Sequence, residues 1–169
     1  MTSGVLAISL LVLFLLYITW TAGRQDRLHA RGDAATAALD AALVRRAAAA
    51  RAVAAALTGP EATVLNTAAD AALEAPEQGR EECENDLSRA LRTALPALPA
   101  GPVLDEIATA TTRVGLARSF HNAAVADTRV VRLRRMPRAL RLAGHRSLPQ
   151  FFEIDDTQDD NLFARPVGE

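Results

Sequence analysis

The feature that most constrains this chain is its first segment, because residues 2–22 carry no charged side chain. As a helix this segment, TSGVLAISLLVLFLLYITWTA, spans about 30 Å, which matches the hydrocarbon thickness of a bilayer. Tyr17 and Trp20 lie near its end, where aromatic rings favour the headgroup region. We therefore predict a transmembrane anchor over residues 1–23 rather than a buried core helix.

The alternative to an anchor is a signal peptide that is removed after export. Signal peptides begin with basic residues, whereas residues 1–4 supply only the α-amino group. Thr21-Ala22-Gly23 is a weak match to the small-residue pattern of a cleavage site. An uncleaved anchor is therefore favoured.

Arginines on one side of the predicted anchor indicate its orientation. None precedes it, whereas Arg24, Arg27 and Arg31 follow it closely. Because basic residues beside a membrane helix favour the cytoplasm, we expect the N-terminus outside and the bundle in the cytoplasm. The expected location is the plasma membrane, which the chain crosses once.

The rest of the chain has the composition of packed helices. Hydrophobic residues make up 50% of the chain, but many are alanine and only 4% of all residues are aromatic. Alanine is the best helix former and buries little surface, so its helices must pack closely. We predict an all-α protein in which the anchor continues into an antiparallel bundle of three to four long helices over residues 24–152. An acidic, disordered tail is expected over residues 153–169.

Breaker residues divide the predicted bundle. The first helix ends at Thr58-Gly59-Pro60, and a second begins near Glu61. Pro76 either kinks this second helix or splits it, and the sequence leaves both open. Beyond the proline-rich turn of residues 96–102, the last long helix carries a stripe spaced by four and three residues. Its members are Val103, Ile107, Ala110, Val114, Ala117, His121, Ala124, Thr128 and Val131.

Arginines gather around the end of this last helix, with no acidic residue among them. The candidates for contact with a partner are Arg129, Arg132, Arg134, Arg135, Arg138 and Arg141. This arginine cluster suits an anionic partner, but capping of the helix dipole and pairing with tail acids explain it equally well. An up-down-up bundle would place the cluster far from the membrane. The net charge of -1 and the lack of interleaved aromatics argue against nucleic acid.

Phe151 and Phe152 form an aromatic pair in a chain poor in aromatic residues. We expect this segment to fold back and cover the bundle, with a docking motif for another protein as the alternative.

No group of residues indicates catalysis, a cofactor or a metal site. His29, His121 and His145 are far apart, and the position of His121 on the stripe indicates a hydrogen-bonded packing role. Cys83 is the only cysteine, which excludes an intrachain disulfide and a cysteine-based metal cluster. P-loop, dinucleotide-binding, HExxH and GxSxG motifs are missing from the sequence. We therefore predict a protein that is not an enzyme.

The segment from Ala117 to Val125, ARSFHNAAV, resembles the most distinctive motif of the LemA family, Ala-Arg-x-x-Tyr-Asn-x-x-Val. Residues 39–46 and 84–91 are similar to two upstream stretches of that family. Pro137 and residues 149–153 resemble its proline and its aromatic-acidic ending. Together with the anchor, the resemblance covers nearly the whole chain in the family's order. The matching motif residues are Ala117, Arg118, His121, Asn122 and Val125.

Several departures indicate a divergent, arginine-rich member of that family. His121 stands where the family has tyrosine, Thr128-Arg129 replaces a Tyr-Asn pair, and residues around Pro76 match poorly. The resemblance implies a membrane-anchored helical bundle with its short N-terminus outside. We expect a scaffold that presents helix faces to an unidentified protein partner. An anion-binding module that uses the arginine cluster is the alternative.

Overall fold

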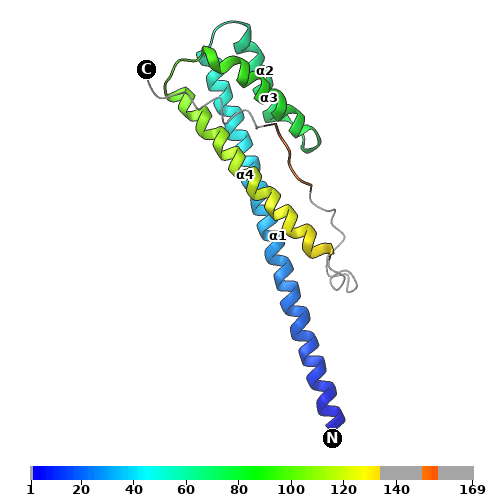
Figure 1. Ribbon diagram of the computed structural model, residues 1–169. Helices are drawn as coiled ribbons and strands as arrows, with labels where there is room; N and C mark the ends of the chain where they lie inside the picture. Colours follow the sequence, from blue (N-terminus) through cyan, green and yellow to red (C-terminus); the bar gives the residue numbers. More distant parts are fainter. Residues whose placement is uncertain (1, 134–149, 156–169) are drawn as a thin grey trace. The chain divides into compact units, whose positions relative to one another are not determined.

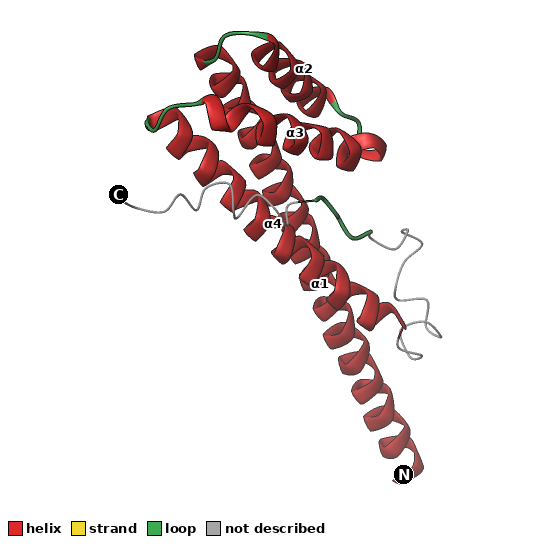
Figure 2. Cartoon of the chain, turned by 45° about the horizontal axis from the view of Figure 1, so that its top comes forward, coloured by secondary structure: helices red, strands yellow, loops and turns green. Residues whose placement is uncertain are grey.

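The computed structural model describes residues 2–133 and 150–155, with side chains given for all of these except 2, 3, 7, 21–29 and 131–133. Every regular element in this part of the chain is helical (Figure 2). The elements are α1 (Thr2–Ala56), α2 (Pro60–Glu74), η1 (Glu77–Gly79), α3 (Arg80–Ala94), η2 (Leu95–Ala97) and α4 (Pro102–Leu133). The prediction of an all-α helical bundle is confirmed. The chain forms two compact units, residues 1–34 with 123–150 and residues 35–122 with 151–169.

The junction between α1 and α2 follows from two residues. Gly59 has a φ of 105°, in the left-handed region that favours glycine. Pro60 then occupies the start of α2, where its missing N–H costs no helical hydrogen bond. The predicted break at these residues is confirmed.

Pro76 splits the second helical stretch into two helices. Its backbone is extended, with φ -68° and ψ 162°, and η1 leads from it into α3. The helices α2 and α3 pack against each other on either side of this break (Figure 1). Of the two alternatives that the sequence left open, the split is the correct one.

Within the second unit, α4 runs antiparallel to α1. Arg45 of α1 pairs with Glu106, near the start of α4, at 3.4 Å. Thr36, earlier in α1, lies 3.3 Å from the ring of His121, later in α4. The expected up-down-up course was wrong, because the split at Pro76 adds one reversal of the chain. The geometric reason for placing the arginine cluster far from the membrane therefore fails.

The core of the second unit is built largely from alanine and leucine. On α4 the predicted stripe is fully buried at Ile107, Ala110 and Val114. The main core cluster draws on α1, α2, α3 and α4, and includes Ala47, Ala50, Val53, Leu65, Ala69, Ala72, Leu87, Leu91, Ala94 and Ile107. Because so many members are alanine, the helices must approach closely to fill this core.

A smaller core cluster extends the unit beyond the expected boundary at residue 152. It contains Leu39 and Leu43 of α1, Val114 of α4 and Ile154 from the C-terminal segment. Ile154 is only 6% exposed. Residues 153–155, expected to begin a disordered tail, therefore pack onto the bundle, while residues 156–169 lie outside the described part.

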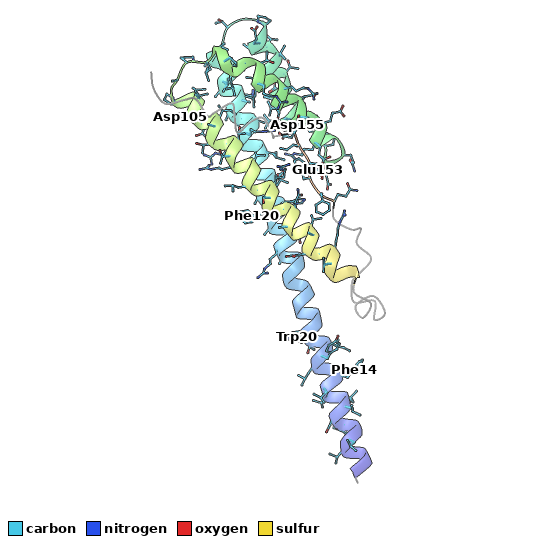
Figure 3. The ribbon with its side chains drawn as sticks, in the orientation of Figure 1. Phe14, Trp20, Asp105, Phe120, Glu153 and Asp155 are labelled. Atoms are coloured by element: carbon cyan, nitrogen blue, oxygen red, sulfur yellow. The ribbon has the colours of Figure 1, made fainter. Side chains whose placement is uncertain are left out.

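In the first unit, the beginning of α1 exposes large apolar side chains. Figure 3 shows two of them, Phe14 and Trp20, pointing away from the helix. The exposed side chains are Val5, Leu6, Ile8, Leu10, Leu11, Val12, Leu13, Phe14, Leu15, Leu16, Tyr17 and Trp20. Among the residues that the structure describes, no helix is both long enough and apolar enough to cross a membrane. The predicted anchor also contains residues 1–3, 7 and 21–23, whose side chains lie outside the described part.

Candidate functional site

A buried ion pair ties α1 to α3. Arg46 and Glu84 are both fully buried, and Arg46 Nη2 lies 2.6 Å from Glu84 Oε2. The same guanidinium donates to Ser88 Oγ and to the Glu84 backbone carbonyl, each at 3.3 Å. Arginine suits this position because its planar group carries five N–H donors that can satisfy several acceptors at once.

The environment of Glu84 changes its acidity. Burial removes water from the carboxylate and raises the pKa of Glu84, while the charge and hydrogen bond of Arg46 and the charge of Arg80 oppose this rise. Its Oε1 atom is buried and has no hydrogen-bond partner among the described residues. The carboxylate is therefore held chiefly by Arg46. Loss of Arg46 would leave the Glu84 carboxylate buried without an opposite charge.

A second ion pair joins the same two helices. Arg80 Nη1, at the start of α3, lies 2.6 Å from Asp40 Oδ1 of α1. The Arg80 side chain is 19% exposed and that of Asp40 56%, so this pair lies at the rim of the unit. Together the two pairs hold α3 against α1 at two points along each helix.

The C-terminal segment docks against α4 through its backbone. The Phe152 N–H donates to Asn122 Oδ1 at 2.9 Å, and Asn122 Nδ2 donates back to the Phe152 carbonyl at 3.1 Å. One helical turn earlier on α4, Arg118 Nη1 donates to the Ile154 carbonyl at 3.3 Å. Both α4 residues belong to the LemA-like motif.

The other edge of the segment binds α3. The N–H groups of Glu153 and Asp155 donate to Glu81 Oε1 and Asn85 Oδ1, each at 2.8 Å. Arg92 Nη1 donates to the Asp155 carbonyl at 3.4 Å. Figure 3 shows Glu153 and Asp155 beside this helix.

The contacts of the segment alternate as in a β-strand. Backbone groups of residues 152 and 154 bind α4, whereas those of 153 and 155 bind α3. Its side chains alternate as well, because Phe152 and Ile154 pack on the smaller core cluster and Phe151 is exposed. We call the receiving residues the tail-docking surface; they are Leu39, Leu43, Glu81, Asn85, Arg92, Val114, Arg118 and Asn122.

The structure brings together most of the LemA-like motif residues. Ala117 packs on the smaller core cluster, Arg118 and Asn122 hold the docked segment, and His121 contacts Thr36. Val125 is buried, in the part of α4 that belongs to the first unit. The expected hydrogen-bonded packing role of His121 agrees with its contact to Thr36.

Sequence reasoning missed both the ion pair and the α3 half of the tail-docking surface. A signal was present, because Arg46 falls between Leu43 and Ala50 on the apolar stripe of α1. Glu84 likewise precedes Leu87 on the buried face of α3. Opposite charges on the buried faces of two adjacent helices indicate an ion pair. This inference requires knowing which helices are adjacent, and the sequence alone does not give that.

Most of the arginine cluster falls outside the described residues. Arg129 is half-buried on α4, and Arg132 lies on α4 without a described side chain. Arg134, Arg135, Arg138 and Arg141 are not described, nor are the side chains of His29, His145 and Val131. Cys83 is half-buried against the main core cluster. Within the described residues, no cluster of three or more His, Cys, Asp or Glu side chains could hold a metal ion.

No protein-family model matches this chain, and neither a curated protein nor a solved structure is found similar to it. The resemblance to LemA proteins therefore rests on the motif residues themselves.

Proposed function

We propose that this chain is a LemA-type, membrane-anchored helical scaffold that binds protein partners and is not an enzyme. The observation that carries the proposal is the series of exposed apolar side chains over residues 5–20 of α1. Contiguous apolar surface in water is unfavourable by about 25 cal/mol per Å², and large exposed patches mark interaction or membrane sites. Lipid hydrocarbon supplies the environment that this surface requires.

The hydroxyl of Thr19, in the same stretch, fits this environment. Thr19 Oγ1 donates to the carbonyls of Leu15 and Leu16, each at 3.0 Å, so its hydroxyl needs no water. In hydrocarbon every polar group needs such an internal partner. Tyr17 and Trp20 lie near the end of the stretch, where their rings suit the headgroup region.

The proposed scaffold role is supported by the construction of the second unit. The pairs Arg46–Glu84 and Asp40–Arg80 fix α3 to α1, which makes a rigid body. LemA-like motif residues on its surface hold an extended peptide segment by its backbone. A rigid body that binds peptide backbone is suited to an adaptor.

The proposed location is the plasma membrane, with the N-terminus outside and the bundle in the cytoplasm. Arg24, Arg27 and Arg31 support this orientation, since no arginine precedes the anchor.

The charge of the arginine cluster favours a second candidate function, an anion-binding module. Because no acidic residue lies among these arginines, anionic lipid headgroups are suitable ligands for them. Replacing Arg132, Arg135 and Arg138 by glutamine should weaken binding to vesicles that contain acidic lipid. Binding that is unchanged by these substitutions, or insensitive to salt, would rule this candidate out.

The anchor is tested by the fluorescence of Trp20, the only tryptophan in the chain. The full chain is reconstituted into vesicles whose lipids carry bromine at known depths, which quenches nearby tryptophan. We expect the strongest quenching from bromine close to the headgroups. Leu11→Asp with Leu15→Asp should abolish it, whereas Val64→Asp, at an exposed position of α2, should not. Emission from the natural chain that bromine does not quench would overturn the anchor.

A further inference from the structure

The tail-docking surface recognises mainly what any extended peptide offers. Side chains of α3 and α4 make six hydrogen bonds to backbone groups of residues 152–155, and Arg92 also pairs with the Asp155 side chain at 4.0 Å. Side chains that bind the backbone of an extended segment accept many sequences, and the alternate side chains that pack on the core give specificity. We propose that this surface binds an extended segment of a partner protein, and that residues 151–155 occupy it when that partner is absent.

Contacts that do not involve the present occupant hold together the helices that form the surface. The ion pairs Arg46–Glu84 and Asp40–Arg80 fix α3 against α1 without any contribution from the C-terminal segment. The main core cluster likewise contains no residue of that segment. A site that stays in place when empty binds its ligand without a cost of reorganisation.

The present occupant is held by contacts that a competitor can replace. Of its side chains, only Ile154 is fully buried, while Phe152 is half-buried and Phe151 is exposed. Its hydrogen bonds to Glu81, Asn85 and Arg92 of α3 are made at exposed positions, where water competes for the same groups. A partner segment with equivalent contacts can therefore displace it.

The side chains define the partner by chemistry. The position of Phe152 takes an aromatic residue and that of Ile154 a branched aliphatic one, because both pack on the smaller core cluster. The position of Asp155 favours an acid, since Arg92 lies beside it. The Glu153 side chain is exposed, so its position accepts any residue. The expected ligand is an aromatic–any–aliphatic–acid segment of a different protein.

This inference rests on the proposed interaction role but not on the membrane anchor. A failure of peptide binding would leave the Trp20 quenching result unaffected, so the two outcomes can be told apart.

The test uses the full chain in detergent and a fluorescent peptide with the sequence of residues 150–155, QFFEID. Phe152→Ala with Ile154→Ala removes the two side chains that pack on the smaller core cluster and so weakens docking of the segment; we call this variant the emptied chain, and circular dichroism checks that its helices remain. We expect this emptied chain to bind the peptide at least about tenfold more tightly than the natural chain, measured by anisotropy, because the tethered competitor is weakened.

Two further changes make the result specific. Adding Asn122→Ala to the emptied chain should weaken peptide binding by about tenfold, since it removes two hydrogen bonds to the peptide backbone. Asn66→Ala, a matched change at an exposed position of α2, should leave binding unchanged. The proposal would be overturned if the emptied chain, still helical, bound the peptide no more tightly than the natural chain. It would also be overturned if Asn122→Ala left peptide binding by the emptied chain unchanged.

The alternative occupant of the tail-docking surface is the C-terminal segment of a second copy of this chain, because that copy carries the same residues 151–155. Cysteines introduced by Asn122→Cys and Phe152→Cys, with Cys83→Ser, should crosslink within one chain. Crosslinked dimers as the main product would assign the surface to a second copy and overturn the assignment to a different protein.

Discussion

The guanidinium of Arg46 lies 2.6 Å from the carboxylate of Glu84, and both side chains are completely buried between α1 and α3. Two charges removed from water each lose several kcal/mol of hydration, which only their mutual attraction and good hydrogen bonds offset. Arg46 supplies such hydrogen bonds, since its guanidinium donates to the Glu84 carboxylate and also to Ser88 Oγ. The position of the tail-docking surface depends on this contact.

Arg46→Met should destabilise the second unit by about 3–5 kcal/mol, because it leaves the Glu84 carboxylate buried without its cation. The free energy of unfolding is measured with urea and circular dichroism on the full chain in detergent. Replacing Glu84 by methionine as well should recover part of the loss. Arg51→Met removes an exposed pair with Asp70 and should cost at most about 1 kcal/mol. Equal losses from Arg46→Met and Arg51→Met would contradict a structural role for the buried pair.

The stability of the chain should depend on the ionisation of Glu84. Its pKa is raised from the ordinary 4.5 in the folded state by burial, so above pH 4.5 the unfolded state releases this proton first. The free energy of unfolding of the natural chain should therefore fall, relative to Glu84→Gln, as pH rises from 4.5. The difference should become constant above the raised pKa. A difference that grows in favour of the natural chain over this range would mean that Arg46 outweighs burial.

Asn122→Ala should release the docked segment from α4. The substitution removes both hydrogen bonds to the Phe152 backbone, each worth about 0.5–1.5 kcal/mol. Hydrogen exchange measured by mass spectrometry should show faster exchange of the amides of residues 152–155, with the core of α2 and α3 unchanged. In Asn66→Ala the exchange of these amides should match that of the natural chain. Persistent protection of the Phe152 amide in Asn122→Ala would contradict this geometry.

Ile154→Ala should cost more stability than Phe151→Ala, although phenylalanine is the larger side chain. Ile154 is 6% exposed and packs on Leu39, Leu43 and Val114, whereas Phe151 is 39% exposed. We expect a loss of about 2 kcal/mol for Ile154→Ala, at the low end for buried aliphatic residues because the site lies at the edge of the core. Phe151→Ala should stay within about 0.5 kcal/mol. A reversed order, measured by urea unfolding, would mean that the segment packs with its other face inward.

Local sequence signals predicted the helices and their breaks. Gly59 and Pro60 determine the backbone conformation only of the turn that contains them. The stripe through Ile107, Ala110 and Val114 shows which face of one helix is buried. Such features depend on nearby residues alone. They are therefore visible without knowledge of the fold.

Contacts between distant segments were predicted less well. The direction of α4 depends on whether Pro76 bends or splits a helix, a choice that the packing of α2 on α3 decides. The docked segment needs Asn122 and Asn85 on opposite sides of it, and these residues meet only in the folded unit. The sequence predicted that the segment with Phe152 folds back onto the bundle, but it did not predict the hydrogen bonds of its backbone.

The central claim, that the anchor crosses a membrane and leaves the bundle in the cytoplasm, is tested most directly by cysteine labelling. With Cys83→Ser as background, Ser3→Cys and Thr109→Cys are expressed separately in intact cells and exposed to a membrane-impermeant thiol reagent. We predict that Ser3→Cys is labelled in intact cells and that Thr109→Cys, at an exposed position of α4, is labelled only after lysis. Labelling of Thr109→Cys in intact cells, or of neither position until lysis, would contradict the claim.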